Sequence, residues 1–544
     1  MGLDRKLKKR IEQIDKNLDA IVKNPYEKVV TEPASEPAPA WARWVFPIGG
    51  AFLSACFALS IVLPLALTGK GVAEPASTVS SHNSGHEKGL TDSTPTMMGG
   101  GPNDYGHYQQ GTYTPETLNC LIAANHGATK GNVGNDGSMS ETTYNSYKAF
   151  TKKFVTLAMN KNNAAGEKST AISIPDAYLT LAITGIISDS DGLQDVLDYL
   201  ELENAQTLSA ACVQIISTLG SMKKDQFGND VGGLSLNSIW LNPQKMALLQ
   251  EKNEGLYREL KNTFDSSLYL EGLTSNRAKQ FIAENGLPGK PVPNIEFSND
   301  NDPAALSVMS TYYNIDVFGY EQGYYQNEYL GGQHTIDYTF GGKTKKVDYI
   351  DRTSLGSCIY ENEAFSGATM RMSESNISFF LPKSRTLMPS AILEEVLDED
   401  YSPKALRYTE GGEEKSTTFY PVNISAPYFF LENKTALERE DLVTSFPHLT
   451  YGGVGSRLAN SLVSENVFLS SVEQFSVMRF DYNGFYSCSA TTASAETSAD
   501  MNNIQEFVLD HPYVFRTSKE VLIGSERRDV PTVIGEIVDP NYLI

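Results

Sequence analysis

The sequence predicts an α+β protein with large sheets, preceded by a single transmembrane helix. Hydrophobic residues make up 40% of the 544 residues and charged residues 20%, which is enough to bury a sizeable core. Only one stretch of the chain is long and apolar enough to span a bilayer. Helical patterns come first and strand patterns later, without the regular alternation typical of parallel α/β folds.

The N-terminal part predicts a membrane anchor. Residues 1–43 combine a basic amphipathic segment with a Pro/Ala linker, and within 44–68 the run 45–67 contains 23 uncharged, mostly apolar residues. Lys and Arg precede this run, so we expect the N-terminus in the cytoplasm and the rest outside a cell membrane. A cleaved signal peptide is the alternative, but the preceding polar segment is long for one.

The remainder divides into a spacer and a globular domain. Residues 69–114 are poor in apolar residues and rich in Gly, Ser, Thr and Pro, which predicts a flexible spacer. The domain is expected to span 115–544. Apolar residues three or four apart predict helices at 145–160, 175–188, 193–202 and 208–219. Strand patterns cover 236–241, 305–318, 342–350, 370–381, 417–430, 477–480, 507–515 and 530–538.

Charge and motifs exclude several classes of function. The net charge of −22 repels nucleic acid, so we expect no nucleic-acid partner. The five cysteines show no CxxC or Cys/His spacing, so we predict no metal site. The GxSxG, GxxxxGK[ST], GxGxxG and HExxH patterns are all missing from the sequence. By these motifs, the sequence therefore reveals no active site and no cofactor-binding loop.

Residues 484–505 have the composition of an exposed loop. Ala, Ser and Thr dominate the segment, and it contains no proline. A strand that has to slip between two others needs small side chains on its buried face and an unbroken set of backbone donors. Residues 487–495 meet both conditions, so the loop could become a strand.

Two C-terminal segments resemble the signature of the serpin family of protease inhibitors. The segment 507–515 matches a strand followed by Asp-His-Pro and an aromatic residue, and 533–540 resembles the last strand of the family. The residues that carry the first match are Phe507, Asp510, His511, Pro512, Tyr513 and Phe515. Upstream segments similar to the family's occur in the same order over 115–544. The resemblance implies three β-sheets, eight to nine helices and an exposed reactive-centre loop.

The resemblance also implies a function, that of a suicide-substrate inhibitor of serine or papain-like cysteine endopeptidases. It thereby implies a protein that is not an enzyme and needs no cofactor. The protease attacks the loop, and the cleaved loop then inserts as a strand into the main sheet. The implied hinge comprises Gly484, Phe485, Tyr486, Ser487, Cys488, Ser489, Ala490 and Thr491.

The scissile bond follows from the family's spacing. Counting forward from Gly484 gives the Ser498–Ala499 bond, and counting backward from Asp510 gives the Met501–Asn502 bond, with Asp500 between them. Ser, Ala or Met at this position suits elastase-like or subtilisin-like proteases. We expect a monomer held at the membrane through 44–68, and an anchor of this type favours a bacterial source.

Two departures from the family leave alternatives open. Phe485 and Tyr486 stand where the family has small hinge residues, and a bulky side chain would slow insertion unless the core holds a pocket for it. A non-inhibitory serpin-fold binding or surface module is therefore the alternative function. An unrelated hydrolase or cell-wall protein is a third. In the family's sheet-opening region, Ser173 and Asp176 stand at the positions of a pair of serines, so the second serine is replaced by aspartate.

Overall fold

The computed structural model describes most of the chain from residue 112 onward. The described residues are 112–126, 137–166, 169–220, 222–224, 230–249, 253–287, 292–317, 335–357, 359–372, 374–399, 401–410, 413–418, 420–452, 458–464, 466–481, 484–487 and 505–543. The predicted cytoplasmic segment, the predicted anchor 44–68 and the spacer up to residue 111 lie outside them. Within the described part, no helix is both long and apolar enough to cross a membrane.

Polar caps set the ends of the main helices. The Ser140 hydroxyl accepts the Thr143 N–H at the start of α3, and Gly166 ends this helix at a φ of 90°, which glycine adopts without strain. The predicted helices correspond to α3–α6 within about five residues at each end. The helices are α3 (Glu141–Ala165), α4 (Ile174–Ile186), α5 (Ser190–Leu200), α6 (Ala205–Leu219), α7 (Glu254–Asn262), α8 (Ser275–Asn285), α9 (Leu393–Asp398), α10 (Arg439–Leu442) and α11 (Pro447–Thr450).

The described residues form two eight-stranded sheets, and we call the first of them the main sheet. Its strands follow the order β1-β6-β5-β7-β19-β18-β17, and β4 adds to β5. The short strand β19 is antiparallel to both of its neighbours, so β7 and β18 run parallel to each other. The strands are β1 (Cys120–Ile122), β4 (Met222–Lys224), β5 (Asp230–Leu241), β6 (Ser266–Tyr269), β7 (Leu306–Val317), β17 (Phe429–Glu438), β18 (Ser471–Asp481) and β19 (Gly484–Ser487).

The part of the chain that the structure describes also contains three further sheets. The first has the order β13-β10-β11-β12-β21-β22-β3 with β2 on β21, the second the order β20-β16-β9-β8, and the third is the hairpin β14–β15. Their strands are β2 (Ser138–Met139), β3 (Thr170–Ser173), β8 (Thr335–Phe340), β9 (Lys343–Ser357), β10 (Ile359–Glu361), β11 (Phe365–Arg371), β12 (Ser375–Pro382), β13 (Ser402–Pro403), β14 (Leu406–Glu410), β15 (Glu413–Thr417), β16 (Tyr420–Pro427), β20 (Gln505–Val508), β21 (Tyr513–Ile523) and β22 (Glu526–Ile537).

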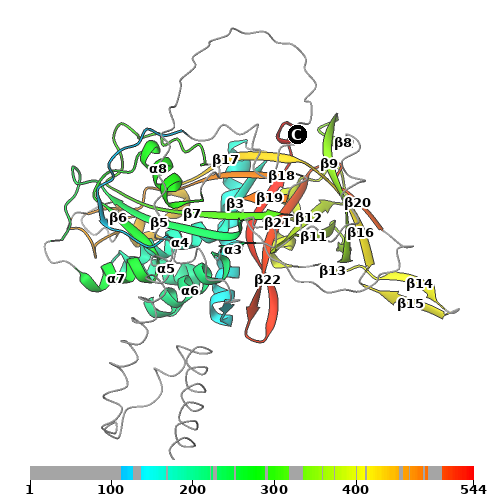
Figure 1. Ribbon diagram of the computed structural model, residues 1–544, viewed down its shortest axis with the longest axis horizontal. Helices are drawn as coiled ribbons and strands as arrows, with labels where there is room; N and C mark the ends of the chain where they lie inside the picture. The colour runs from blue at the N-terminus through cyan, green and yellow to red at the C-terminus, as the bar shows by residue number, and fades with distance from the viewer. Residues whose placement is uncertain are drawn as a thin grey trace, which may run out of the picture. The chain divides into compact units, whose positions relative to one another are not determined.

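Helices cover both faces of the main sheet (Figure 1). One apolar cluster joins α3–α6 to one face of the sheet. A second cluster lies on the other face, where Phe281 of α8 packs on Trp240 of β5 and Tyr269 of β6. A third cluster joins the β17–β19 end of the main sheet to the other large sheet and the four-stranded sheet. All three clusters have residues on the main sheet, so the rest of the fold is organised around it.

Three segments predicted as single strands each hold more than one. The segment 370–381 contains a turn, closed by the Met372 N–H donating to Ser375 O, that separates β11 from β12. In 417–430 the chain passes from the end of β15 to β16 and then leaves for the main sheet as β17. In 507–515 it leaves β20 and joins β21. Apolar alternation continues across these breaks because the flanking residues are buried in the next sheet, so the pattern alone does not reveal them.

Candidate functional site

A cavity separates β7 from β18 over most of their length. In the described residues these two parallel strands share no ladder, because each pairs with β19 at one end only. Beyond β19 a cavity of about 380 Å³ lies between residues 306–313 of β7 and 471–478 of β18. We call this cavity the slot. Its walls are two parallel strands that β19 already joins at one end, so an antiparallel strand continuing from β19 is the element that would complete the sheet.

Strand β19 occupies the end of the slot. Its Phe485 stands opposite Phe480 of β18 on one side and Asp316 of β7 on the other. The Phe485 side chain is 1% exposed, and its ring lies 6.4 Å from that of Phe429 and 6.1 Å from that of Phe515. The core therefore holds a pocket for the first of the two hinge aromatics, the condition that the sequence left open.

One side chain ties β18 to the floor of the slot. Gln474 Nε2 donates to Ser173 O at 2.7 Å, and Gln474 Oε1 accepts from Ser173 N at 3.0 Å. Ser173 precedes α4, and Pro175 occupies a first-turn position that proline favours. Gln474 Nε2 also lies 3.3 Å from Asp176 Oδ2. The start of α4 and β18 are thus held together at the place where the slot would have to widen.

Asp176 is an ionisable group inside this contact. It lies in the first turn of α4 and lines the slot. Burial raises the pKa of Asp176 to about 7, and the hydrogen bonds it accepts from Ser173, from backbone N–H groups and from Gln474 only partly offset this. The folded state therefore holds a proton here that the unfolded chain releases near pH 4.

The Asp176→Asn substitution tests this carboxyl. The raised pKa means that the parent protein loses stability as pH rises from about 4 to about 7, and that the loss is complete above this range. Asn cannot ionise but keeps an oxygen for Gln474, so we expect the variant to be about 2 kcal/mol or more stable than the parent at pH 8 and nearly equal at pH 4. Urea unfolding at both pH values measures this. The exposed Asp302→Asn serves as control, and equal effects of the two substitutions at pH 8 would contradict the account.

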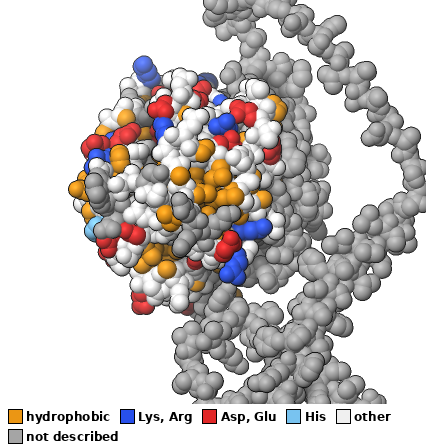
Figure 2. Space-filling view, turned by 90° about the vertical axis from the view of Figure 1, so that its left-hand side faces the viewer, with side chains coloured by type: hydrophobic (Ala, Val, Ile, Leu, Met, Phe, Trp, Pro, Cys, Tyr) orange, Lys and Arg blue, Asp and Glu red, His pale blue; other side chains and the backbone are white. Residues whose placement is uncertain are grey.

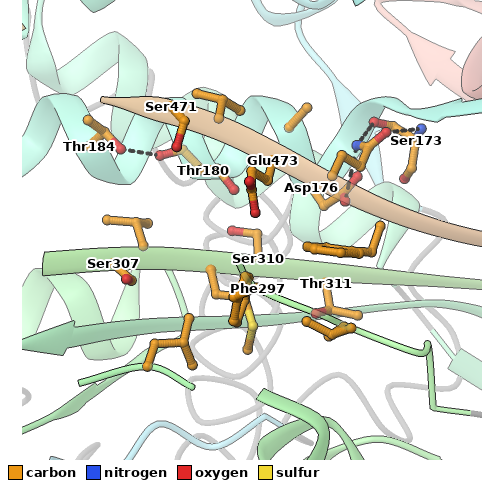
Figure 3. Close-up of a pocket in the computed structure, with 18 of the residues that line it drawn as sticks. Ser173, Asp176, Thr180, Thr184, Phe297, Ser307, Ser310, Thr311, Ser471 and Glu473 are labelled. Carbon is orange, nitrogen blue, oxygen red and sulfur yellow. Dashed lines mark hydrogen bonds between the residues drawn. The ribbon is translucent and has the colours of Figure 1, made fainter. Parts of the chain in front are cut away.

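Several hydroxyl groups that line the slot have no hydrogen-bond partner among the described residues. Ser310 Oγ of β7 and Ser476 Oγ of β18 are buried without a partner. Figure 3 shows Ser310 on β7 and Glu473 on β18, the two strands that border the open space. Buried polar atoms are normally hydrogen-bonded, so these hydroxyls favour a polar occupant of the slot.

The segment after α8 covers the outer side of the slot. Residues 293, 295 and 297–299 line the cavity, and the ring of Phe297 meets that of Phe475 of β18 edge to face at 5.6 Å. The Phe297 N–H donates to Ser275 Oγ, and Ser275 Oγ donates to Asp300 Oδ1. The covering segment is therefore fixed to the first residue of α8 and crosses from β7 to β18.

Solved structures share the overall fold of this chain. The chain is similar to the thermophilic serpin tengpin in its native state (TM-score 0.53, 14% identity, 78% of this chain and 100% of that one). It is also similar to Arabidopsis AtSerpin1 in the native stressed conformation (TM-score 0.52, 12% identity, 73% and 99%) and to human thyroxine-binding globulin complexed with thyroxine (TM-score 0.50, 12% identity, 73% and 99%). The chain has the serpin fold. No family model matches the sequence, and no curated protein is significantly similar to it.

The C-terminal segment that resembles the serpin signature lies where sheets meet. The His511 ring nitrogens lie 2.7 Å from Asp510 Oδ1 and 2.8 Å from Pro382 O, and Asp510 pairs with Arg385. Pro512 precedes β21, in which Tyr513 and Phe515 are fully buried. Phe507, in β20, packs in the same apolar cluster as Phe485. These residues support the fold around the hinge, since Phe515 touches both Phe429 and Phe485.

The structure describes the first four residues of the predicted reactive loop. Backbone pairing is described for Gly484, Phe485, Tyr486 and Ser487. The predicted hinge residues Cys488, Ser489, Ala490 and Thr491 and the predicted scissile residues Ser498, Ala499, Asp500, Met501 and Asn502 lie outside the described residues.

Sequence reasoning missed several residues of the slot. Gln474, Ser310 and Ser476 carry no motif, and only the three-dimensional arrangement brings them together. The sequence pointed to Asp176 because it stands at the position of a serine in the sheet-opening region of serpins. It did not indicate that the Asp176 side chain is buried. In the part of the chain that the structure describes, no group of His, Cys, Asp and Glu could hold a metal ion.

Proposed function

We propose that this protein is a suicide-substrate inhibitor of serine or papain-like cysteine endopeptidases that uses residues 484–505 as its reactive-centre loop. The observation that carries the proposal is the slot, together with the strand β19 that has already entered one end of it. The fold shared with solved serpins supports it at the level of architecture.

The register of β19 supports the proposal quantitatively. Ser487 stands opposite Asn314, and Tyr486 opposite Arg479. Continuing both ladders would bring residues 488–495 opposite 313–306 of β7 and opposite 477–470 of β18. The open stretches that line the slot are 306–313 and 471–478, so the lengths agree. Since Phe485 faces the core, every second residue after it would too, and within 488–495 those residues are Ser489, Thr491, Ala493 and Ala495.

The chemistry requires no catalytic group from this chain. The protease nucleophile bonds to the carbonyl carbon of the scissile residue, the peptide C–N bond breaks, and the new amine leaves with a proton from the protease's general acid. Insertion of 488–495 into the slot would then carry the acyl-linked protease away before water reaches the ester or thioester. The hydroxyls of Ser310 and Ser476 would gain polar neighbours in the process.

The proposed protease partners and the proposed membrane location of the protein rest on the sequence alone. The candidate scissile residues suit elastase-like or subtilisin-like endopeptidases, and the protein would act as a monomer. Residues 44–68 would anchor it in a cell membrane with its N-terminus in the cytoplasm. The spacer would let the loop reach proteases within roughly 35–40 Å of the membrane, at ~5–6 Å × √n.

A denaturing gel tests the proposal. Incubating the full chain with an elastase-like, a subtilisin-like and a trypsin-like protease should give an SDS-resistant complex with at least one of the first two and none with the last. The reason is that residues 484–515 contain no Lys or Arg. A protease blocked at its nucleophile is the control and should give no complex. A complex with the trypsin-like protease alone would overturn the predicted specificity, and cleavage without any complex would overturn inhibition.

The alternative is a non-inhibitory serpin-fold binding or surface module. One similar structure is that of human thyroxine-binding globulin complexed with thyroxine, so the fold itself does not decide between the two. The aromatic hinge Phe485–Tyr486 favours this alternative, while the buried pocket around Phe485 favours inhibition. A loop that is cut by every protease tested, with no complex and no change in thermal stability, would support the alternative.

A further inference from the structure

Residues 114–122 fasten α8 to one edge of the main sheet, and we call them the clasp. At one end β1 pairs with β6, with Cys120 opposite Tyr269 and Ile122 opposite Leu268. The Leu270 N–H extends this pairing by donating to Asn119 O at 2.8 Å. The clasp thus adds an edge strand to β6, on the opposite side of the main sheet from β17.

At its other end the clasp binds the side of α8. The Glu116 N–H donates to Gln280 Oε1 at 2.9 Å, and Gln280 Nε2 donates back to Glu116 O at 2.8 Å. The Glu116 carboxylate accepts from Asn276 Nδ2 at 2.7 Å and from Arg277 Nε at 3.1 Å. Asn276 also exchanges two hydrogen bonds with the backbone of Thr114. One acidic residue therefore reaches three residues in adjacent turns of α8.

Besides these polar contacts, three partly buried apolar residues hold the clasp, and they are Leu118, Leu121 and Ile122. Cys120 is exposed, and its two neighbours in β1 are only partly buried. The side of the molecule that bears β6 and α8 carries acidic and basic side chains interspersed with apolar ones (Figure 2). Arg277 of α8 makes a second ion pair on this side of the molecule, since its Nε also lies 3.1 Å from Glu271 Oε2. Attachments of this kind can open without exposing a large apolar surface.

The helix that the clasp holds also carries the cover of the slot. Phe281 of α8 packs edge to face on Trp240 and Tyr269. The segment that follows α8 crosses the slot, where Phe297 meets Phe475, and Ser275 and Asp300 tie this segment back to the start of α8. A strand that filled the whole slot would need the cover, and with it α8, to move outward.

We propose that the clasp controls how readily the slot opens, by holding α8 and the covering segment down on the main sheet. This inference rests on the proposed function, since it regulates loop insertion. The clasp also continues directly from the predicted spacer 69–114, so a pull on the spacer would act first on the contacts of Thr114 and Glu116. Release of the clasp speeds insertion, and a closed clasp keeps the uncleaved protein from filling its own slot.

Hydrogen exchange in the full chain tests the clasp independently of inhibition. Glu116→Ala removes the carboxylate bonds to Asn276 and Arg277, and we expect amide exchange in α8 and 293–299 to become about tenfold faster. Glu116→Gln keeps an acceptor without the charge, and it should give an intermediate increase. The matched control is Glu141→Ala, because Glu141 makes a comparable pair of bonds to Arg528 but does not touch α8. The control should leave exchange in α8 unchanged.

A second readout is the rate at which the melting temperature changes after the loop is cut. If the clasp and the proposed function both hold, Glu116→Ala speeds exchange in α8 and also speeds the change. Alternatively, exchange could become faster while cutting the loop leaves the melting temperature of every variant unchanged. The clasp would then hold α8 in place, but there would be no loop insertion for it to regulate. The regulatory claim and the proposed function then both fail. If α8 exchanges as in the parent, the clasp proposal fails, whatever the loop does.

Discussion

Replacing Phe485 with alanine is expected to lower the free energy of unfolding of the uncleaved protein by about 3–5 kcal/mol. The ring is 1% exposed and packs against Phe429 and Phe515, so its removal leaves a cavity where the main sheet meets the other large sheet. Urea unfolding of the two proteins, followed by fluorescence and circular dichroism, measures the difference. The loss would also free the hinge, so the variant should be cut faster in its loop.

A matched control distinguishes the loss of stability caused by emptying the Phe485 pocket from the loss caused by removing any phenyl ring. Phe468 is 39% exposed and packs against Arg439, so Phe468→Ala should cost about 1 kcal/mol. If Phe485→Ala costs no more than Phe468→Ala, then β19 does not occupy the end of the slot in solution. The account of a hinge that has already entered the sheet would then be wrong.

Thr491→Glu is expected to convert the inhibitor into a substrate. Extended from β19, the register would bring residue 491 between Ser310 and Gln474, with its side chain toward the core near Asp176. Burying an unpaired carboxylate costs several kcal/mol, so the rate of loop insertion would become lower than the rate of hydrolysis of the acyl-enzyme. On a denaturing gel, the yield of SDS-resistant complex with the elastase-like protease should fall at least about tenfold while cleavage continues.

The control for this variant carries the same charge outside the slot. Asn503→Glu lies beyond the candidate scissile residues, and it should leave the yield of complex close to that of the parent protein. A Thr491→Glu protein that forms complex as well as Asn503→Glu would show that residue 491 does not enter the main sheet.

Much of the fold could be predicted from the sequence, because local patterns encode it. The helices α3 to α6 carry apolar residues at helical spacing, and the C-terminal strands alternate apolar and polar residues around the Asp-His-Pro turn. The helix α8 was missed because most of its eleven residues are polar, and its buried apolar residues are Ala278, Phe281 and Ile282. The clasp was missed because its nine residues are too few to show a periodicity.

The candidate site depended on contacts between residues far apart in the chain. Whether Phe485 could enter the sheet turned on Phe429 and Phe515, and neither has a local pattern that marks it as part of a pocket. The same holds for Gln474, which reaches the backbone of Ser173 about three hundred residues earlier. Sequence resemblance located the loop, but only the structure located the slot that would receive it.

Thermal unfolding of the full chain before and after a single cut in residues 498–502 tests the central claim most directly. Filling the slot adds an eight-residue central strand, with roughly 16 backbone hydrogen bonds at ~1 kcal/mol each. For a domain of this size we therefore predict a rise of about 10 °C or more in the melting temperature. An unchanged or lower melting temperature after complete cutting would contradict the account, because the loop would then not enter the main sheet.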